Sequence, residues 1–280
     1  MKIIETIGEM QRESDSMRMA GDIISVVPTM GFLHEGHLEL MRVAKRHSDK
    51  VVMTLFVNPT QFGPAEDFEA YPRDTEGDLE KARSLGVDIV FMPNAIEMYQ
   101  EGCQTTVRVE RITQPLCGLS RPGHFDGVTT VVNKLFNCTK PHLAIFGQKD
   151  YQQLAAISRM VMDLNMDIKI IGVPTVREPD GLAMSSRNSY LNPEERQSAL
   201  CLKKSLDLAN KMFQEGTKDA RIIKETIESL IKAHPFTRID YVSLCDPMTL
   251  EEIEILKDET LLALAVRVGK TRLIDNCLIR

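Results

Sequence analysis

Short apolar runs rich in β-branched residues alternate with amphipathic segments through about residue 180 of this chain. The runs at 23–27, 51–57, 87–92, 143–146 and 168–173 predict β-strands, and we expect Pro28 to end the first. Between them, apolar residues recur at helical spacing near 38–44, 79–85, 128–136 and 154–164, which predicts helices. Continuous apolar strands that alternate with helices indicate a parallel sheet covered on both faces, in a Rossmann-like α/β fold.

The pattern changes after about Ser186. Over 193–234 it predicts two successive helices, with Asn192 as N-cap, Pro193 at the first helical position and Gly216 between the helices. The runs at 239–244, 261–268 and 272–279 follow without long helices between them and predict a small antiparallel sheet. We therefore expect a Rossmann-like domain over residues 1–183 and a smaller α+β domain over 184–280.

Composition and charge narrow the class of protein. The 280 residues are 43% hydrophobic and 26% charged, as in ordinary globular proteins. Lys and Arg number 34 and Asp and Glu 40, so the net charge is −6 and a broad nucleic-acid-binding surface is not expected. The six cysteines form no C-x-x-C pair, which favours reduced thiols, and the sequence shows neither a signal peptide nor a membrane span. We expect a cytoplasmic protein that binds neither nucleic acid nor membrane.

The segment Pro28 to His37, PTMGFLHEGH, joins the first predicted strand to the first helix. Open α/β sheets bind ligands at this position, and a helix N-terminus offers N–H groups and positive dipole to a phosphate. Gly31 and Gly36 permit close backbone approach, and His34 and His37 can donate hydrogen bonds to phosphate oxygens as a leaving group departs. Two alternatives stay open: one histidine caps the helix while the other packs, or the pair binds a metal.

A second group of candidate phosphate ligands lies further along the chain. Lys149 follows a short predicted strand, and Ser185, Ser186 and Arg187 form a polar run. Lysine offers a compact charge, the hydroxyls are donors, and the guanidinium presents a rigid fork. These residues would hold a triphosphate without a P-loop. The alternatives are a solvated Lys149–Asp150 pair at a helix start and a turn with a surface arginine.

The histidine segment resembles the H-x-G-H signature of the nucleotidyltransferase superfamily. The longer string P-T-M-G-x-L-H-x-G-H resembles one family within it, pantothenate synthetase, also called pantoate–β-alanine ligase. Four further blocks match that family in order, at 56–63 (FVNPTQFG), 121–128 (RPGHFDGV), 146–153 (FGQKDYQQ) and 177–188 (REPDGLAMSSRN). Five blocks in one order are far more specific than a single H-x-G-H, and they span about residues 28–191.

The resemblance implies three sets of site residues. The catalytic set is His34, His37, Lys149, Ser185, Ser186 and Arg187. The ATP-binding set is Met30, Gly31, Phe32, Leu33, His34, Glu35, Gly36, His37, Gly147, Gln148, Lys149, Asp150, Val176, Met184, Ser185, Ser186 and Arg187. The pantoate-binding set is Met30, Asn58, Gln61, Tyr71, Arg121, His124 and Gln153, with loop support as the alternative role of Arg121 and His124. Amides such as those of Gln61 and Gln153 suit a small hydroxy acid, because each both donates and accepts.

The implied reaction forms pantoyl-adenylate and pyrophosphate from pantoate and Mg·ATP, after which the β-alanine amine displaces AMP. His37 would be the proton donor. Mg²⁺ would be held largely by ATP, with Asp78 as a protein ligand, although the neighbouring position, acidic in some relatives, is Gly77 here. The resemblance also implies a homodimer and a lid role for the second domain. Another H-x-G-H nucleotidyltransferase, or a non-catalytic nucleotide-binding regulator, stays an alternative.

Overall fold

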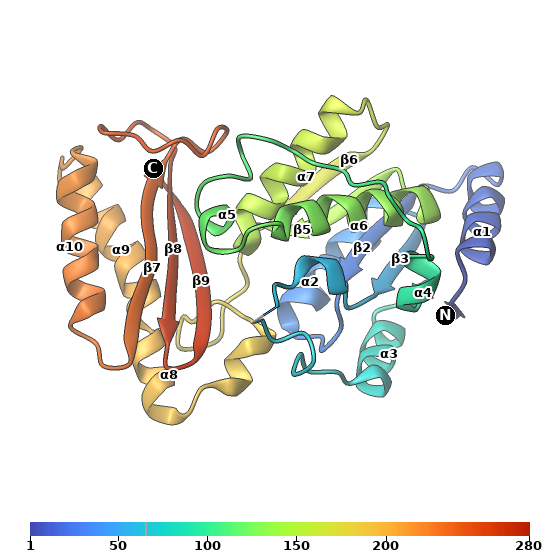
Figure 1. Cartoon of the computed structure of the whole chain (residues 1–280), viewed down its shortest axis with the longest axis horizontal. Coiled ribbons are helices and arrows are strands. Elements are labelled where there is room, and N and C mark those ends of the chain that lie inside the picture. Colours follow the sequence, from blue (N-terminus) through green and yellow to red (C-terminus); the bar gives the residue numbers. More distant parts are fainter. Residues whose placement is uncertain (65) are drawn as a thin grey trace. The chain divides into compact units, whose positions relative to one another are not determined.

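The chain divides into two compact units in the computed structural model, which describes residues 1–64 and 66–280 (Figure 1). Unit 1 comprises Met1–Val109, Arg121–Gln148 and Gln153–Pro174, and unit 2 comprises Glu110–Ser120, Lys149–Gln152 and Thr175–Arg280. The main division therefore falls somewhat before the expected boundary at 183. Two short segments from the first half of the chain also belong to unit 2, which no feature of the sequence indicated. The lid role of the second domain stays a prediction.

Unit 1 contains, among its described residues, a six-stranded parallel sheet in the order β1-β4-β3-β2-β5-β6. Its strands are β1 (Lys2–Ile4), β2 (Ile24–Thr29), β3 (Lys50–Leu55), β4 (Ile89–Phe91), β5 (Leu143–Gly147) and β6 (Lys169–Val173). The predicted α/β fold is confirmed. From β2 the chain builds the sheet outward through β3 and β4, and later through β5 and β6 on the other side. The strand order thus reverses between β2 and β5, where open sheets bind ligands beyond the carboxyl ends of the strands.

Helices cover both faces of this sheet (Figure 1). They are α1 (Ile7–Met19), α2 (Glu35–His47), α3 (Thr75–Ser84), α4 (Ala95–Met98) and α6 (His124–Thr139), with most of α7 (Tyr151–Asp163) and the 3₁₀ turn η1 (Pro59–Gln61). Side chains alternate between the faces of a strand. Val27 and Met53 accordingly pack in one cluster with residues of α2 and α3, whereas α1 and α6 pack on each other and also contact β2.

The expectation that Pro28 ends its strand was wrong. Pro28 lies inside β2 and pairs with Thr54 of β3. The carbonyl of Thr29 accepts from the Phe56 amide, so Thr29 faces β3 and its neighbour Pro28 faces β5. Registered pairing with β5 stops at Val26, although β5 continues to Gly147, so the N–H that proline lacks interrupts only this pairing. Pairing with β3 continues to Thr29 and keeps Pro28 inside the strand.

Unit 2 is built on the antiparallel sheet β7 (Thr237–Cys245), β8 (Thr260–Val268) and β9 (Thr271–Ile279). Helices α9 (Cys201–Gln214) and α10 (Ala220–Lys232) pack on it through a core that includes Leu206, Ile227 and Leu264. It also holds α5 (Cys117–Ser120), η2 (Gln148–Asp150) in large part, and η3 (Ser186–Tyr190).

The predicted pair of helices over 193–234 was wrong in number, because α8 (Pro193–Ala199) is separate from α9. The break falls at Leu200, whose backbone is almost helical, with φ −62° and ψ −13°. Neither Gly nor Pro marks the junction in the sequence. The expected cap is confirmed, since Asn192 forms a capping box with Glu195 and Pro193 follows it.

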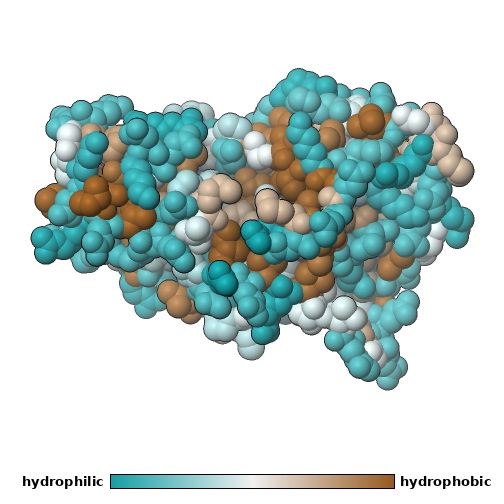
Figure 2. All heavy atoms as spheres, turned by 90° about the horizontal axis from the view of Figure 1, so that it is seen from above, coloured by the Kyte–Doolittle hydropathy of each residue, from teal (hydrophilic) through white to brown (hydrophobic). Residues whose placement is uncertain are grey.

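The surface agrees with the charged composition. On the face drawn in Figure 2, hydrophilic side chains cover most of the area and hydrophobic ones gather in separate patches. All six cysteines are free thiols. Within the described residues, no helix has the length and apolarity required to cross a membrane.

Candidate active site

His34 and His37 both take part in the N-terminal cap of α2. His34 is the N-cap residue, and its Nδ1 accepts from the Gly36 amide at 3.2 Å. His37 reaches back, and its Nδ1 accepts from the His34 amide at 3.3 Å. The two rings lie with their centroids 4.1 Å apart. The alternative in which one histidine caps is thus partly right, but the second imidazole belongs to the same cap.

The cap determines which nitrogen of each ring carries the hydrogen. An imidazole nitrogen accepts an N–H bond only when it carries no hydrogen itself, so the hydrogen of each neutral ring is on Nε2. Two Nε2–H donors are therefore present at the positive end of α2, at the carboxyl end of β2. This is an arrangement that can bind an anion.

Asp78 of α3 is 1% exposed and bonds to the backbone just before the histidine cap. Its Oδ2 accepts from the Phe32 amide and its Oδ1 from the Leu33 amide, each at 2.7 Å. Mg²⁺ prefers an open octahedral set of oxygens and retains waters, which this enclosed carboxylate does not suit. In the part of the chain that the structure describes, no group of three or more His, Cys, Asp or Glu that could hold a metal occurs. These residues do not fit a protein-built Mg²⁺ site.

Three residues of the expected pantoate set meet in unit 1. The amide of Gln61 donates to the Met30 sulfur at 3.2 Å, and Asn58 Nδ2 donates to Gln61 Oε1 at 3.1 Å. Asn58 itself is 1% exposed, and its Oδ1 accepts from the hydroxyl of Tyr99 at 2.8 Å. Asn58 thus positions Gln61, while Gln61 and Met30 lie at the carboxyl ends of adjacent strands.

Arg121 and His124 support the Gln61 segment. Arg121 forms two 2.6 Å hydrogen bonds to the carboxylate of Glu66, and its Nη1 lies 2.9 Å from His124 Nε2. His124 Nδ1 lies 2.8 Å from the Gln61 carbonyl oxygen, which can only accept, so Nδ1–H is the donor. Burial raises the pKa of Glu66, but the bonds and charge of Arg121 outweigh burial, and the pKa is lowered overall. These contacts favour loop support over direct contact with pantoate.

Four more of the expected site residues lie in unit 1, namely Tyr71, Gly147, Gln148 and Gln153. Tyr71 is 6% exposed, and its ring meets that of Phe62 edge-on at 6.0 Å. Gly147 and Gln148 end β5 and begin η2, and Gln153 is a half-buried residue of α7.

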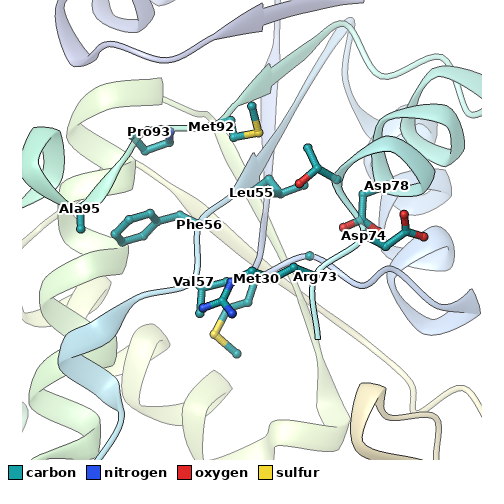
Figure 3. Close-up of a pocket in the computed structure, with 12 residues that line it drawn as sticks. Met30, Leu55, Phe56, Val57, Arg73, Asp74, Asp78, Met92, Pro93 and Ala95 are labelled. Carbon is teal, nitrogen blue, oxygen red and sulfur yellow. The ribbon is translucent and has the colours of Figure 1, made fainter. Parts of the chain in front are cut away.

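A cavity of about 290 Å³ lies beyond the carboxyl ends of β2, β3 and β4 (Figure 3). Met30, Leu55, Phe56 and Met92 form its apolar wall, and Arg73, Asp74 and Asp78 are on its polar side. Met30 is therefore common to the cavity and to the Gln61 contact.

The expected phosphate ligands Lys149, Ser185, Ser186 and Arg187, with Asp150, Val176 and Met184, are in unit 2. The Met184 amide bonds to the Val176 carbonyl at 3.0 Å, which closes a hairpin that leads into η3. Ser185 caps η3 by accepting from the Arg187 amide at 3.3 Å, and Ser186 is 8% exposed.

Strand β9 forms hydrogen bonds both to the hairpin that precedes η3 and to Lys149. Arg177 of the hairpin donates twice to Asp275, at 2.6 and 2.9 Å, and Asn276 Nδ2 donates to the Lys149 carbonyl at 2.8 Å. Burial lowers the pKa of Lys149, and the charge of Arg187 lowers it further, against the opposing charges of Asp150 and Asp275. Lys149 and Arg187 are thus close enough to influence each other.

Sequence reasoning missed the residues that hold the site residues in place. Glu66, Tyr99, Lys81, Asp275 and Asn276 lie far in sequence from the residues that they bond. No local motif could have indicated them, because each contact depends on the tertiary fold.

The doubly wound sheet, with a pair of histidines capping the helix after its central strand, defines a nucleotide-binding type of α/β protein. The sequence profile of the family described as Pantoate-beta-alanine ligase matches residues 2–278. The chain therefore belongs to the pantoate-beta-alanine ligase family.

Similar proteins cover the whole chain. Pantothenate synthetase of Syntrophus aciditrophicus is 56% identical over 276 residues, which are 99% of this chain and 96% of that protein. That of Geobacter sulfurreducens is 54% identical over 279 residues, which are 100% of this chain and 99% of that protein. The crystal structure of pantothenate synthetase from Thermus thermophilus has a TM-score of 0.94 and 42% identity, over 100% of this chain and 99% of that one. The pantoate-beta-alanine ligase of Francisella tularensis, complexed with beta-gamma ATP and beta-alanine, has a TM-score of 0.81 and 33% identity, over 99% and 97% of the chains.

Proposed function

We propose that this protein joins pantoate to β-alanine at the expense of ATP and yields pantothenate, AMP and pyrophosphate. In the first step a carboxylate oxygen of pantoate forms a bond to the α-phosphorus of ATP as the bond to pyrophosphate breaks. In the second step the β-alanine amine attacks the acyl carbon, AMP leaves with the carboxylate oxygen, and the amine loses a proton. The first step makes an acyl group with a good leaving group, which the free carboxylate lacks.

One observation carries this proposal beyond family membership: the mutual cap of His34 and His37. The cap leaves Nε2–H as the donor on each ring, in the positive field of α2. Preorganised donors of this kind stabilise charge that develops on phosphate oxygens in the transition state. In the neutral ring that the cap requires, His37 would donate a hydrogen bond from Nε2–H and His34 a second one. As the expected proton donor His37 would have to be an imidazolium, whose Nδ1 no longer accepts from the His34 amide.

The other residues have roles that their surroundings support. Gln61, which Asn58 holds against Met30, would bind the hydroxyls and carboxylate of pantoate. Lys149, Ser185, Ser186 and Arg187 would stabilise the departing pyrophosphate. Gln153 and Tyr71 are proposed pantoate contacts, and Gly147, Gln148 and Asp150 would line the ATP site.

Three further expectations belong to the proposal. Mg²⁺ would enter with ATP, bound to its phosphates. The protein would act in the cytoplasm, as the scattered free thiols favour. It would form a homodimer, which sedimentation velocity would test directly.

The test is identification of products from defined mixtures. With Mg²⁺, ATP and pantoate, only a single turnover of pyrophosphate release is expected, since the adenylate stays bound. Addition of β-alanine should give continuous release of AMP and equimolar pantothenate. ATP binding by calorimetry without turnover on any pairing of acid and amine would instead indicate a nucleotide-binding regulator.

A further inference from the structure

We infer that Asp78 is a positioning residue and not a ligand of Mg²⁺. Its carboxylate fixes the loop 30–34, which ends at His34, by accepting from two backbone amides of that loop. The inference rests on the proposed function for its kinetic consequences. The contacts themselves are independent of that function.

The loop has an uncommon backbone conformation, and a side chain from outside it accepts two of its N–H bonds. Gly31 has φ +86° and Phe32 has φ +51°, so two successive residues are left-handed, and Phe32 is not a glycine. Consecutive backbone N–H groups that point toward one place form a concavity for an anion. The carboxylate of Asp78 fills it, with one oxygen on the Phe32 amide and the other on the Leu33 amide, both at 2.7 Å.

The carboxylate of Asp78 packs tightly against Gly31. A Cβ added at Gly31 would lie 2.9 Å from Asp78 Oδ2, closer than real Cβ contacts. The carboxylate is also almost entirely removed from solvent. Asp78 is thus built into the loop.

The same helix holds the next carbonyl of the loop. Lys81, three residues after Asp78 in α3, donates from Nζ to the Leu33 carbonyl at 2.9 Å. Helix α3 therefore bonds to both the N–H and the carbonyl of Leu33. Leu33 directly precedes His34, the N-cap of α2, so these two bonds help to position both imidazoles.

The variant that tests the inference is Asp78→Asn. An amide group can accept only through its oxygen, so its NH₂ would face one of the two backbone N–H donors and the loop would lose an anchor. Misplacement of reacting groups by a fraction of an ångström to 1 Å reduces rates by roughly 10- to 100-fold. We expect the rate of pantoate-dependent exchange of pyrophosphate into ATP to fall by that amount, while the Mg²⁺ concentration for half-maximal rate is unchanged.

A second readout does not use activity. Hydrogen exchange of the Phe32 and Leu33 amides should be faster in Asp78→Asn than in the unsubstituted protein. The matched control is Asp88→Asn, since Asp88 Oδ2 accepts one backbone bond, from Val51 at 2.9 Å, outside the loop, and asparagine can still accept it. In Asp88→Asn, the rate of pyrophosphate exchange into ATP and the protection of the loop amides from hydrogen exchange should both be unchanged.

The outcomes are distinguishable. Recovery of the Asp78→Asn rate at raised Mg²⁺, or loop amides that stay protected, would overturn the inference. If Asp78→Asn does not fold, the unsubstituted protein still decides: amides of Phe32 and Leu33 that exchange hydrogen as fast as exposed amides, or that lose protection when Mg²⁺ is added, would overturn the inference. If the unsubstituted protein shows no pantoate-dependent exchange of pyrophosphate into ATP, the proposed function fails. Hydrogen exchange of the Phe32 and Leu33 amides still decides the role of Asp78.

Discussion

Individual atoms of the two histidines determine what the site can do. Each imidazole uses Nδ1 to accept a backbone N–H, and each therefore offers Nε2–H. In each ring, therefore, one nitrogen caps the helix and the other is the donor proposed to bind a phosphate oxygen. The sequence showed both histidines and the helix start, but it could not show which nitrogen faces the backbone, because that depends on the rotamers in the folded loop.

His37→Asn separates the two ends of the ring. The asparagine oxygen can take the place of Nδ1 and accept from the His34 amide, but no donor remains where Nε2–H was. We expect kcat to fall about 100-fold, as for loss of a single transition-state donor, with thermal stability nearly unchanged. The control is His47→Asn, at the exposed end of α2. Activity retained in His37→Asn would show that His37 is only a cap.

Lys149 gives a prediction for pH. Its folded-state pKa is below the ordinary 10.5, chiefly because burial disfavours the ammonium form, so the charge is lost at lower pH than for an exposed lysine. ATP affinity, measured by calorimetry between about pH 7 and 10, should therefore fall as pH rises. Lys149→Met should bind ATP more weakly at neutral pH and with no such fall, whereas Lys169→Met, at an exposed position, should follow the unsubstituted protein. Constant affinity of the unsubstituted protein up to pH 10 would contradict the assigned role.

At the level of elements, the position of the Gln61 segment depends on close approach of α6 to η1. Gly127 of α6 lies against the backbone of Thr60 and Gln61, and its carbonyl accepts from Asn58 Nδ2 at 3.1 Å. The sequence block that contains Gly127 marked the residue without giving its reason. The reason is that helix and turn pack backbone to backbone.

Gly127→Ala tests this packing. The added Cβ would lie 2.4 Å from the Thr60 carbonyl oxygen and 2.7 Å from the Gln61 nitrogen, so η1 must move. We expect the KM for pantoate to rise at least about 10-fold and stability to fall by about 1–3 kcal/mol, as for overpacking, while the KM for ATP changes little. Gly8→Ala in α1, whose Cβ would meet only the end of Arg12 at 3.5 Å, should be neutral or stabilising. An unchanged KM for pantoate in Gly127→Ala would show that Gln61 does not bind it.

Elements with strong local patterns were predictable, and those defined by tertiary pairing were not. The apolar runs of β3, β5 and β8 located those strands to within a few residues. Strand β1, only Lys2–Ile4, exists through its pairing with β4 and carries no pattern of its own. Pro28 was misjudged because it interrupts pairing with β5 only, while pairing with β3 carries the strand on to Thr29.

At the scale of the whole molecule, a net charge of −6 conceals local cationic and donor groups. The sequence located them at the histidine loop, at Lys149 and at Arg187, and it indicated two domains. It could not indicate that Lys149–Gln152 and Glu110–Ser120 belong to the second unit, since residues such as Asn276 assign them by long-range bonds. The motifs thus indicated the candidate site residues, but not the contacts that hold those residues in place.

The proposed adenylation of pantoate before β-alanine enters is tested most directly by isotope exchange. The protein is incubated with Mg²⁺, ATP and labelled pyrophosphate, with or without pantoate, and the label in ATP is measured. We expect exchange that requires pantoate and does not require β-alanine, because the adenylate forms reversibly without the amine. Exchange that does not depend on pantoate, or that appears only when β-alanine is present, would contradict it.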